Sequence, residues 1–441
     1  MEVDAKSKTL RNLNFIFFLV SLLLTLIIPN EPSQWERFAD TRDYLKQSQF
    51  SPFSRDFYSA RPSENFYPRP FTVPMLYKIA GSRPEAIVAM QKMLHWLSVF
   101  MLVSALMLFL KSAFIRFLLI ISVYFLMSWW NIAGWTTQVL SESIAFSFLL
   151  CWLAACLFLF KFRTWRMMLL HIAVTILFCF TRDSWIYIVL CFYLMILVTA
   201  FLLDRQFLKY TVVMLLTGIL IFFIQGASSR IGQRTKLPVA NSIVLRILPD
   251  NRYYAWFEAR GMPDATIIKK RLSSLDIRRD EEKARFFALY SDPEYRNFLD
   301  WSADQGRKNY VKFLITHPGY SLLLNESPEK LDRIFAMNLD YMEKVNGYSL
   351  VAEMVFPVFS PLSGLILSLI LVIIFIKRKD PALLLPLFTA LMFVLNVFLL
   401  YNADTMEVDR HLLFTLIMVQ LLCIWACALI LDEFISRVKG R

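Results

Sequence analysis

Charged side chains stand at the ends of long apolar stretches at four places in the sequence. They are Asp40-Thr41-Arg42-Asp43-Tyr44, Glu142, Arg182-Asp183 and the segment from Asp404 to His411. An ionisable group near membrane depth is costly and usually has a partner or a task. Carboxylates beside guanidiniums at a membrane surface can activate a hydroxyl group and stabilise a phosphate leaving group. We therefore predict that these four places carry the functional residues.

The elements that must position these residues are membrane helices. Hydrophobic residues make up 57% of the 441 residues and charged residues only 19%. Apolar runs recur along the chain, and an α-helix needs about 20 such residues to cross a hydrocarbon core of ~30 Å. The net charge of +12 does not indicate nucleic acid, because the basic residues lie in short tracts between apolar runs. The sequence predicts an all-α integral membrane protein with about ten transmembrane helices.

The first apolar run, 15–28, has no small-residue cleavage site after it, so we interpret it as a retained span rather than a signal peptide. Nine further spans are predicted at 92–110, 117–135, 139–160, 167–181, 184–203, 211–225, 355–376, 381–401 and 411–431. The stretch 167–203 is too long for one crossing, so we divide it at Thr181-Arg182-Asp183.

The basic residues predict the orientation of these spans. Tracts that fall on one side are Lys6/Lys8/Arg11, Lys111/Arg116, Lys161/Arg163/Arg166, Arg205/Lys209, Lys377/Arg378/Lys379 and Arg437/Lys439/Arg441. By the positive-inside rule both termini are cytoplasmic, and the segments 30–91 and 226–353 face outward. All four charged places then lie on the same outer face, where folding can bring them into one cavity.

The expected organisation has three parts: an N-terminal transmembrane module over 1–225 whose outer loop is 30–91, an outer helical domain over 226–353, and C-terminal transmembrane helices over 354–441. In the outer loop we expect a surface helix within 30–51, an irregular proline-rich stretch, and a helix over 73–80 ended by Gly81. Ser82-Arg83-Pro84-Glu85 matches a capping box for the next span. Helical patterns in the outer domain fall near 281–291, 293–316 and 328–345.

Five short motifs resemble those of the GT-C superfamily of polytopic glycosyltransferases, bacterial enzymes that take a sugar from a polyprenyl-phosphate carrier. They are Asp40-Thr41-Arg42-Asp43-Tyr44, Arg69-Pro70-Phe71-Thr72-Val73-Pro74-Met75-Leu76, Leu140-Ser141-Glu142-Ser143, Thr181-Arg182-Asp183 and Asp409-Arg410-His411. The chain departs from the family pattern in two respects. Asp43 stands beside the expected Asp40, so either could be the functional carboxylate, and the outer domain lies between middle spans.

The resemblance implies a multi-pass enzyme of the bacterial inner membrane, with its active site on the periplasmic face and a glycan or lipid as acceptor. Asp40 or Asp43 would be the catalytic base. The donor phosphate would be bound by Arg182, Arg410 and His411. Tyr44, Arg69 and Glu142 would orient the substrates. The expected partners are the polyprenyl-phosphate sugar, the acceptor and membrane lipids, with no nucleic acid.

Simpler readings exist for the same residues. Glu142 could only complement a helix dipole, and Arg182 and Arg410 could only extend to lipid headgroups. A polysaccharide polymerase or ligase would share the outer loop and the arginines, whereas a transporter would place its ionisable residues near the middle of spans. All six cysteines lie in apolar runs, so no disulfide framework is expected. We expect no cofactor. The resemblance leaves a divalent metal open, because some members of the superfamily use one, but the acidic residues are scattered and we predict no site for it.

Overall fold

The computed structural model describes residues 2–27, 40–61, 66–234, 236–272, 293–322, 361–378, 385–403 and 408–439. Within these ranges the chain is all-α, as predicted, and its only β feature is an isolated bridge between Arg61 and Phe66. The chain divides into two compact units. Unit 1 consists of Met1–Ser228, Asn338–Leu395 and Leu413–Arg441, and unit 2 of Ser229–Met337 and Asn396–Leu412.

In the part of the chain that the structure describes, seven helices are long and apolar enough to cross a membrane, which makes the chain a multi-pass helical membrane protein by length and hydropathy. They are α1 (Glu2–Ile27), α4 (Pro84–Met107), α7 (Ser141–Phe162), α9 (Trp185–Leu203), α10 (Leu208–Ile231), α21 (Leu385–Ala403) and α22 (Val408–Lys439). Each coincides with one of the predicted spans.

Three further apolar helices occupy the other predicted spans: α5 (Ala113–Ser128), α8 (Trp165–Cys179) and α20 (Pro361–Arg378). With 16 and 15 residues, α5 and α8 are short for a perpendicular crossing. The division of 167–203 is confirmed, because α8 ends at Cys179 and α9 begins at Trp185. A count of ten spans, rather than seven, stays a prediction.

One predicted boundary is wrong, because α5 ends at Ser128 and does not continue to residue 135. The chain instead forms the short helices α6 (Trp130–Ala133) and η4 (Gly134–Thr137). Gln91 of α4 is fully buried, and its amide donates hydrogen bonds to the carbonyl oxygens of Thr136 and Gln138 at 3.3 and 2.9 Å. Hydrogen bonds from a neighbouring helix therefore hold the end of η4.

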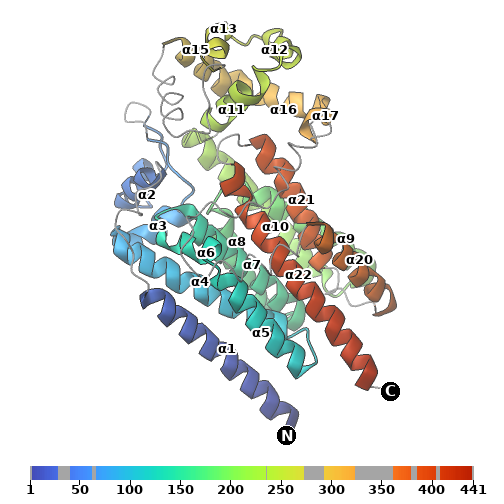
Figure 1. Ribbon diagram of the computed structural model, residues 1–441. Helices are drawn as coiled ribbons and strands as arrows, with labels where there is room; N and C mark the ends of the chain where they lie inside the picture. The colour runs from blue at the N-terminus through green and yellow to red at the C-terminus, as the bar shows by residue number, and fades with distance from the viewer. Residues whose placement is uncertain are drawn as a thin grey trace. The chain divides into compact units, whose positions relative to one another are not determined.

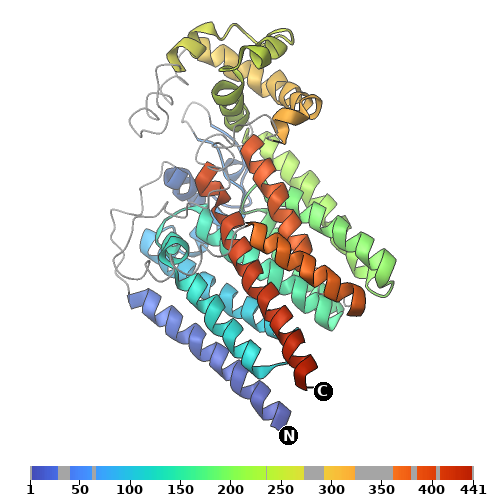
Figure 2. The same ribbon diagram turned by 45° about the vertical axis from the view of Figure 1, so that its right-hand side comes forward.

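In unit 1, α4 packs against both α1 and α7, and α7 packs against α8 (Figure 1). Helix α7 is apolar around most of its circumference and buried along most of its length, as expected of a helix at the centre of a bundle. Figures 1 and 2 show the beginning of α1 and the end of α22 at one end of this unit. The elements that carry the first loop lie at the opposite end (Figure 1).

That loop contains α2 (Asp40–Gln49), η2 (Arg55–Phe57) and α3 (Thr72–Ile79). The predicted ending of α3 is confirmed, because Gly81 has a φ of 73°, which glycine adopts without strain. The predicted capping box is wrong. Ser82 has a φ of 57° and belongs to the turn, and its hydroxyl oxygen accepts a hydrogen bond from Ser48 at 2.8 Å. Arg83 is the residue at the N-cap of α4.

Unit 2 has its own apolar core, in which Ile243, Phe257 and Phe313 are fully buried. Its helices are α11 (Lys236–Ser242), η5 (Ile243–Ile247), α12 (Asn251–Glu258), α13 (Thr266–Leu272), α15 (Pro293–Trp301), η7 (Ser302–Gly306), α16 (Arg307–Thr316) and α17 (Pro318–Ser321). The helical pattern predicted for 293–316 is confirmed. The patterns at 281–291 and 328–345 lie outside the described residues.

Asp432 should contribute to the stability of unit 1 because it joins α22 to the start of α5. Its carboxylate accepts hydrogen bonds from the backbone N–H groups of Lys111 and Ser112 at 2.9 and 2.6 Å. Charged hydrogen bonds to buried backbone groups contribute roughly 1.5–3 kcal/mol, so Asp432→Ala should destabilise the protein by about 2 kcal/mol in thermal unfolding in detergent. Arg437→Ala removes only a half-exposed ion pair with Glu433 and should cost less than about 0.5 kcal/mol. Equal losses would contradict this role.

Candidate functional site

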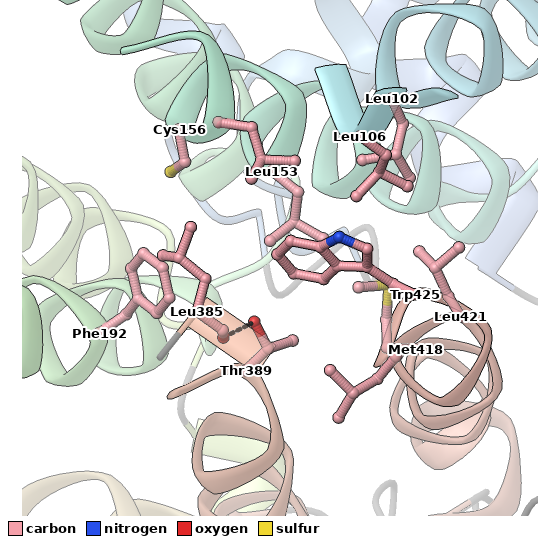
Figure 3. Close-up of a pocket in the computed structure, with 12 residues that line it drawn as sticks. Leu102, Leu106, Leu153, Cys156, Phe192, Leu385, Thr389, Met418, Leu421 and Trp425 are labelled. Carbon is pink, nitrogen blue, oxygen red and sulfur yellow. Dashed lines mark hydrogen bonds between the residues drawn. The ribbon is translucent and has the colours of Figure 1, made fainter. Parts of the chain in front are cut away.

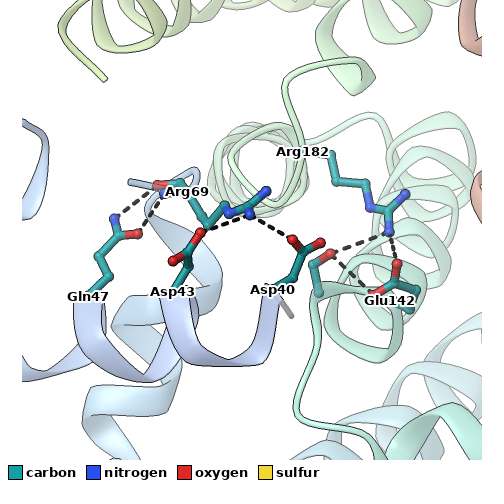
Figure 4. Close-up of polar contacts among 7 residues, drawn as sticks. Asp40, Asp43, Gln47, Arg69, Glu142 and Arg182 are labelled. Atoms are coloured by element: carbon teal, nitrogen blue, oxygen red, sulfur yellow. Dashed lines mark hydrogen bonds and ion pairs between the residues drawn. The ribbon is translucent and has the colours of Figure 1, made fainter. Parts of the chain in front are cut away.

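The first polar cluster is built by α2 and the loop that follows it. Asp40 and Asp43 are three residues apart in the first turn of α2, so they share one face of the helix. The guanidinium of Arg69 lies between them, and its Nη2 atom is 2.7 Å from Asp40 Oδ1 and 2.9 Å from Asp43 Oδ2 (Figure 4). Two carboxylates therefore share one cation.

Gln47 holds the backbone of Arg69 in place. Its side-chain oxygen accepts a hydrogen bond from the Arg69 N–H at 2.6 Å, and its amide nitrogen donates to the Arg69 carbonyl at 2.9 Å. The same nitrogen donates to the Phe57 carbonyl at 3.0 Å, and the Gln47 side chain is fully buried. Because Pro68 and Pro70 flank Arg69 and have no N–H groups, this amide supplies pairing that the local chain lacks.

Burial and the neighbouring positive charge shift the pKa of Asp43 in opposite directions. Burial raises the pKa of the Asp43 carboxyl above its ordinary value, although the Arg69 guanidinium beside it acts to lower that pKa. Burial alone would lower the pKa of Arg69, but the charges of Asp40 and Asp43 raise it above the ordinary arginine value. Arg69 is therefore charged at every physiological pH, and Asp43 is a stronger base than an exposed aspartate.

The second polar cluster joins the start of α7 to the turn between α8 and α9. Glu142, in the first turn of α7, is 2% exposed, and its carboxylate contacts Arg182 Nη2. The same nitrogen lies 3.3 Å from the hydroxyl oxygen of Ser141. The guanidinium carbon of Arg182 lies 4.8 Å from the ring centre of Phe414 in α22. Arg182 thus points into unit 1, so the reading in which it only extends to lipid headgroups is wrong.

Gln225 of α10 fixes the turn that carries Arg182. Its amide nitrogen lies within 3.1–3.2 Å of the carbonyl oxygens of Cys179 and Arg182 and of the Asp183 carboxylate. The carbonyl groups at the end of a helix have no partner within it, and Gln225 supplies one for the end of α8. Each arginine of the site is therefore positioned through its backbone by a buried glutamine from another element.

Tyr44 connects the two clusters. Its ring centre lies 5.7 Å from the guanidinium carbon of Arg69, and its hydroxyl is near enough to Glu142 and Ser141 for both to affect its pKa. Burial raises the pKa of the Tyr44 hydroxyl, so it stays protonated. Figure 4 shows Asp40 between Arg69 and the pair formed by Glu142 and Arg182. The two clusters therefore form one polar site.

Helix α3 also ties the loop of Arg69 to the turn of Arg182. The Thr72 hydroxyl donates a hydrogen bond to the Leu177 carbonyl at 2.9 Å, and the Thr72 N–H donates to the Phe180 carbonyl at 3.2 Å. Thr72 is fully buried and follows Arg69 by three residues. The juxtaposition of the two arginines is thus supported by backbone contacts as well as by side chains.

The site retains hydrogen-bonding groups that have no partner among the described residues. They include the Nε–H of Arg69, the Nε–H of Arg182, the hydroxyl of Ser143 and the indole N–H of Trp185. A buried donor without a partner costs about 1–3 kcal/mol. Guanidinium N–H groups that face such a site can bind an anionic oxygen, as in a phosphate or carboxylate.

The structure brings together six of the residues predicted for the site. They are Asp40, Asp43, Tyr44, Arg69, Glu142 and Arg182. Arg410 and His411 lie in the first turn of α22, but their side chains are not among those described. Their inclusion in the site stays a prediction, and Asp404 lies outside the described residues.

Sequence analysis missed Gln47, Gln225 and Phe414. Gln225 is a polar residue at the end of a predicted span, which is itself a signal of function or of a backbone contact. No local pattern distinguishes Gln47 or Phe414, because both act on residues that are distant in the sequence: Arg69 and Arg182.

A separate pocket lies in unit 1 and is lined mainly by apolar side chains (Figure 3). It is lined by Leu102, Leu106, Leu153, Cys156, Leu157, Phe192, Leu385, Thr389, Met418, Leu421, Leu422 and Trp425. The hydroxyl of Thr389 donates to the Leu385 carbonyl at 2.7 Å. None of the lining residues is charged, and none of them belongs to the polar site. Across the described residues no group of three metal-ligating side chains occurs.

The chain matches no protein-family model, no curated protein and no solved structure. The class defined by the fold is that of a multi-pass helical membrane protein. Among the described residues, a set of acid–arginine contacts lies at the end of the bundle that carries the first loop.

The raised pKa of Asp43 predicts how stability depends on pH. The folded protein binds the Asp43 proton more tightly than the unfolded chain, whose value is 3.8. The wild type should therefore gain stability relative to Asp43→Asn as the pH falls from 7 through the folded-state pKa, and lose it as the pH rises. Melting temperatures of both proteins in detergent at pH 7 and pH 4.5 would test this. A difference that is constant, or that changes in the opposite direction, would show that Arg69 dominates over burial.

Proposed function

We propose that the protein is a glycosyltransferase of the GT-C type, which moves a sugar from a polyprenyl-phosphate donor to a glycan or lipid acceptor. The observation that supports the proposal is the closeness of the two acid–arginine clusters, with Asp40 lying between Arg69 and the Glu142–Arg182 pair (Figure 4). One part of the site offers carboxylates that can accept a proton, and the other offers a guanidinium that can bind a phosphate. Such a transfer needs both, a few ångströms apart.

In the proposed reaction the carboxylate of Asp40 accepts the proton of the acceptor hydroxyl as its oxygen attacks the anomeric carbon. The bond between that carbon and the phosphate oxygen breaks at the same time, with inversion, and the phosphate leaves with the bonding electron pair. Asp40 is favoured over Asp43 because it lies on the side of Arg69 that is nearer to Arg182 (Figure 4). Asp43 would then hold Arg69, and Arg69 would orient Asp40.

Arg182 is the proposed ligand of the phosphate group. Its Nε–H has no partner among the described residues, while its Nη2 contacts Glu142. The pair with Glu142 would keep the guanidinium in one orientation. The hydrogen bond from this Nε–H to the phosphate would become stronger as negative charge develops on the leaving oxygen. An interaction that strengthens in this way stabilises the transition state. Arg410 and His411 are proposed to complete the phosphate site.

We also propose a membrane topology and a location for the enzyme. The apolar runs favour ten spans, and the basic tracts favour cytoplasmic termini with the first loop on the outer face. The resemblance to the GT-C superfamily implies that this face is the periplasmic face of a bacterial inner membrane. The module of residues 1–225 would hold the catalytic loop, 226–353 the outer domain and 354–441 the last helices. A lipid-linked donor is consistent with an active site at the end of a membrane bundle, where the lipid tail stays in the bilayer.

The role of Asp40 predicts that Asp40→Asn abolishes transfer while the protein stays folded and membrane-inserted. Loss of a general base typically costs 10²- to 10⁴-fold, whereas Asp43→Asn should cost much less. The measurement is the release of polyprenyl phosphate from a panel of radiolabelled polyprenyl-phosphate sugars in proteoliposomes with acceptor lipids.

Thermal unfolding of both variants is the control for folding. Normal turnover in Asp40→Asn together with loss of turnover in Asp43→Asn would show that Asp43, not Asp40, is the base. Normal turnover in both variants would reject the mechanism. A wild type that releases lipid phosphate only from donors carrying a whole glycan would instead be a polymerase or ligase.

The phosphate-binding role predicts that Arg182→Lys weakens the binding of a short-chain polyprenyl monophosphate, the product common to all such donors. Lysine keeps the charge but cannot offer two parallel N–H groups, so affinity should fall about 10- to 100-fold, the equivalent of one or two lost hydrogen bonds to a charged group. Arg410→Lys should behave alike. Calorimetry in detergent would measure both, with Arg437→Lys as a matched control near the opposite end of α22. Unchanged affinity in Arg182→Lys and Arg410→Lys would remove both residues from the site.

A further inference from the structure

Helix α16 has one face in the core of unit 2 and an apolar face that is exposed. Tyr310 and Phe313 are buried in the core, whereas Val311 and Ile315 are 50% and 74% exposed. These two residues are four positions apart, so they lie on the same side of the helix. Leu322, just beyond α17, is 47% exposed. Exposed apolar side chains grouped in this way mark a surface that contacts a protein or a membrane.

The same face of α16 is basic. Arg307, Lys308 and Lys312 are exposed, and the helix contains no acidic residue. Apolar residues combined with lysine and arginine are typical of helices that lie in the headgroup region of a membrane. Long basic side chains there place their charge among anionic headgroups while their methylene groups stay in the apolar layer.

Contacts within unit 2 attach α16 and α17 to the end of α21. Helix α21 is a candidate span of 19 residues and is therefore about 29 Å long, close to the ~30 Å of a hydrocarbon core. Its last residues must then lie at the interface. The Tyr310 hydroxyl donates to the Asn402 carbonyl at 2.8 Å, and the Asn402 amide donates to the Ser321 carbonyl at 2.8 Å. Helices α16 and α17 are thus attached to α21 where it leaves the membrane.

Aromatic residues beside the end of α16 are also of the types that occur at membrane interfaces. The rings of Tyr253 and Trp256 in α12 lie 6.1 and 5.7 Å from the ring of His317 and are half-buried. The guanidinium of Arg260 lies 3.7 Å from the Trp256 ring. Tyrosine and tryptophan are enriched at membrane interfaces, where one part of the ring is apolar and the other is hydrated.

We propose that the α16 face, which consists of Val311, Ile315 and Leu322 with Arg307, Lys308 and Lys312, is a membrane-docking surface that binds anionic lipid headgroups. The apolar residues enter the boundary between headgroups and acyl chains, and the basic residues contact phosphate groups. This surface attaches unit 2 to the bilayer independently of the proposed transferase activity.

The depth of the face can be measured on the full chain in liposomes. In a background with Cys191 and Cys427 replaced by serine, single cysteines at Ile315 and Leu322 would carry a fluorophore, with lipids that bear a nitroxide near the headgroup as quenchers. Asn297, an exposed polar position on α15, is the matched control. We expect lipid quenching at 315 and 322 to exceed that at 297 several-fold. Quenching equal to that at 297, quenching by aqueous iodide instead, or protection from both would overturn the proposal.

The preference for anionic lipid is tested by charge reversal in the variant labelled at residue 315. Lipid quenching should be stronger in liposomes containing phosphatidylglycerol than in pure phosphatidylcholine. The double variant Lys308→Glu, Lys312→Glu should lose this difference, and Lys308→Arg, Lys312→Arg should keep it. Both positions are exposed, and melting temperatures will verify folding. Equal quenching in liposomes with and without phosphatidylglycerol, in all three proteins, would overturn the proposal that the surface binds anionic headgroups.

Discussion

A guanidinium that is removed from water must be matched by a carboxylate, and the site depends on this constraint. A buried charge without a partner costs several kcal/mol, so Arg182, only 13% exposed, requires Glu142. Arg69 requires Asp40 and Asp43 in the same way. Asp40, Asp43 and Arg69 all belong to the first loop, whereas Glu142 and Arg182 belong to the helix bundle. Each ion pair therefore forms within its own part, and the packing of the loop on the bundle brings the two clusters together.

Two glutamine side chains near these pairs form hydrogen bonds with the backbone that carries the arginines, not with the guanidinium groups. Gln47 bonds both backbone polar groups of Arg69, and Gln225 bonds the turn that carries Arg182. Neither amide touches a guanidinium. The Nε–H group of each arginine is buried and has no hydrogen-bond partner among the described residues, while the backbone that carries the arginine is fixed by a glutamine amide. An arrangement that is fixed in advance suits electrostatic stabilisation, because little reorganisation is needed when a charged ligand binds.

The parts that could be predicted from the sequence follow from the cost of charge in a membrane. Apolar runs located the helices, and ionisable residues at their ends located Asp40, Glu142 and Arg182. The end of α5 could not be predicted, because the chain that forms α6 and η4 after Ser128 is held by hydrogen bonds from Gln91 in another helix. Gln47 was missed for the same reason: its partners, Phe57 and Arg69, lie 10 and 22 residues away. Ser82 matched a capping motif, yet the turn at Gly81 gives it a backbone conformation that the motif does not allow.

The central claim is that the two clusters act together as one site for a lipid phosphate. The most direct test is a structure of the full chain, determined by electron cryomicroscopy in a lipid nanodisc, with a short-chain polyprenyl monophosphate bound. The account predicts a phosphate oxygen about 3 Å from Arg182 Nε, at hydrogen-bonding distance, with the Asp40 carboxylate on the same side of the phosphate. A phosphate bound elsewhere, with Arg182 still in contact only with Glu142 and Ser141, would contradict it.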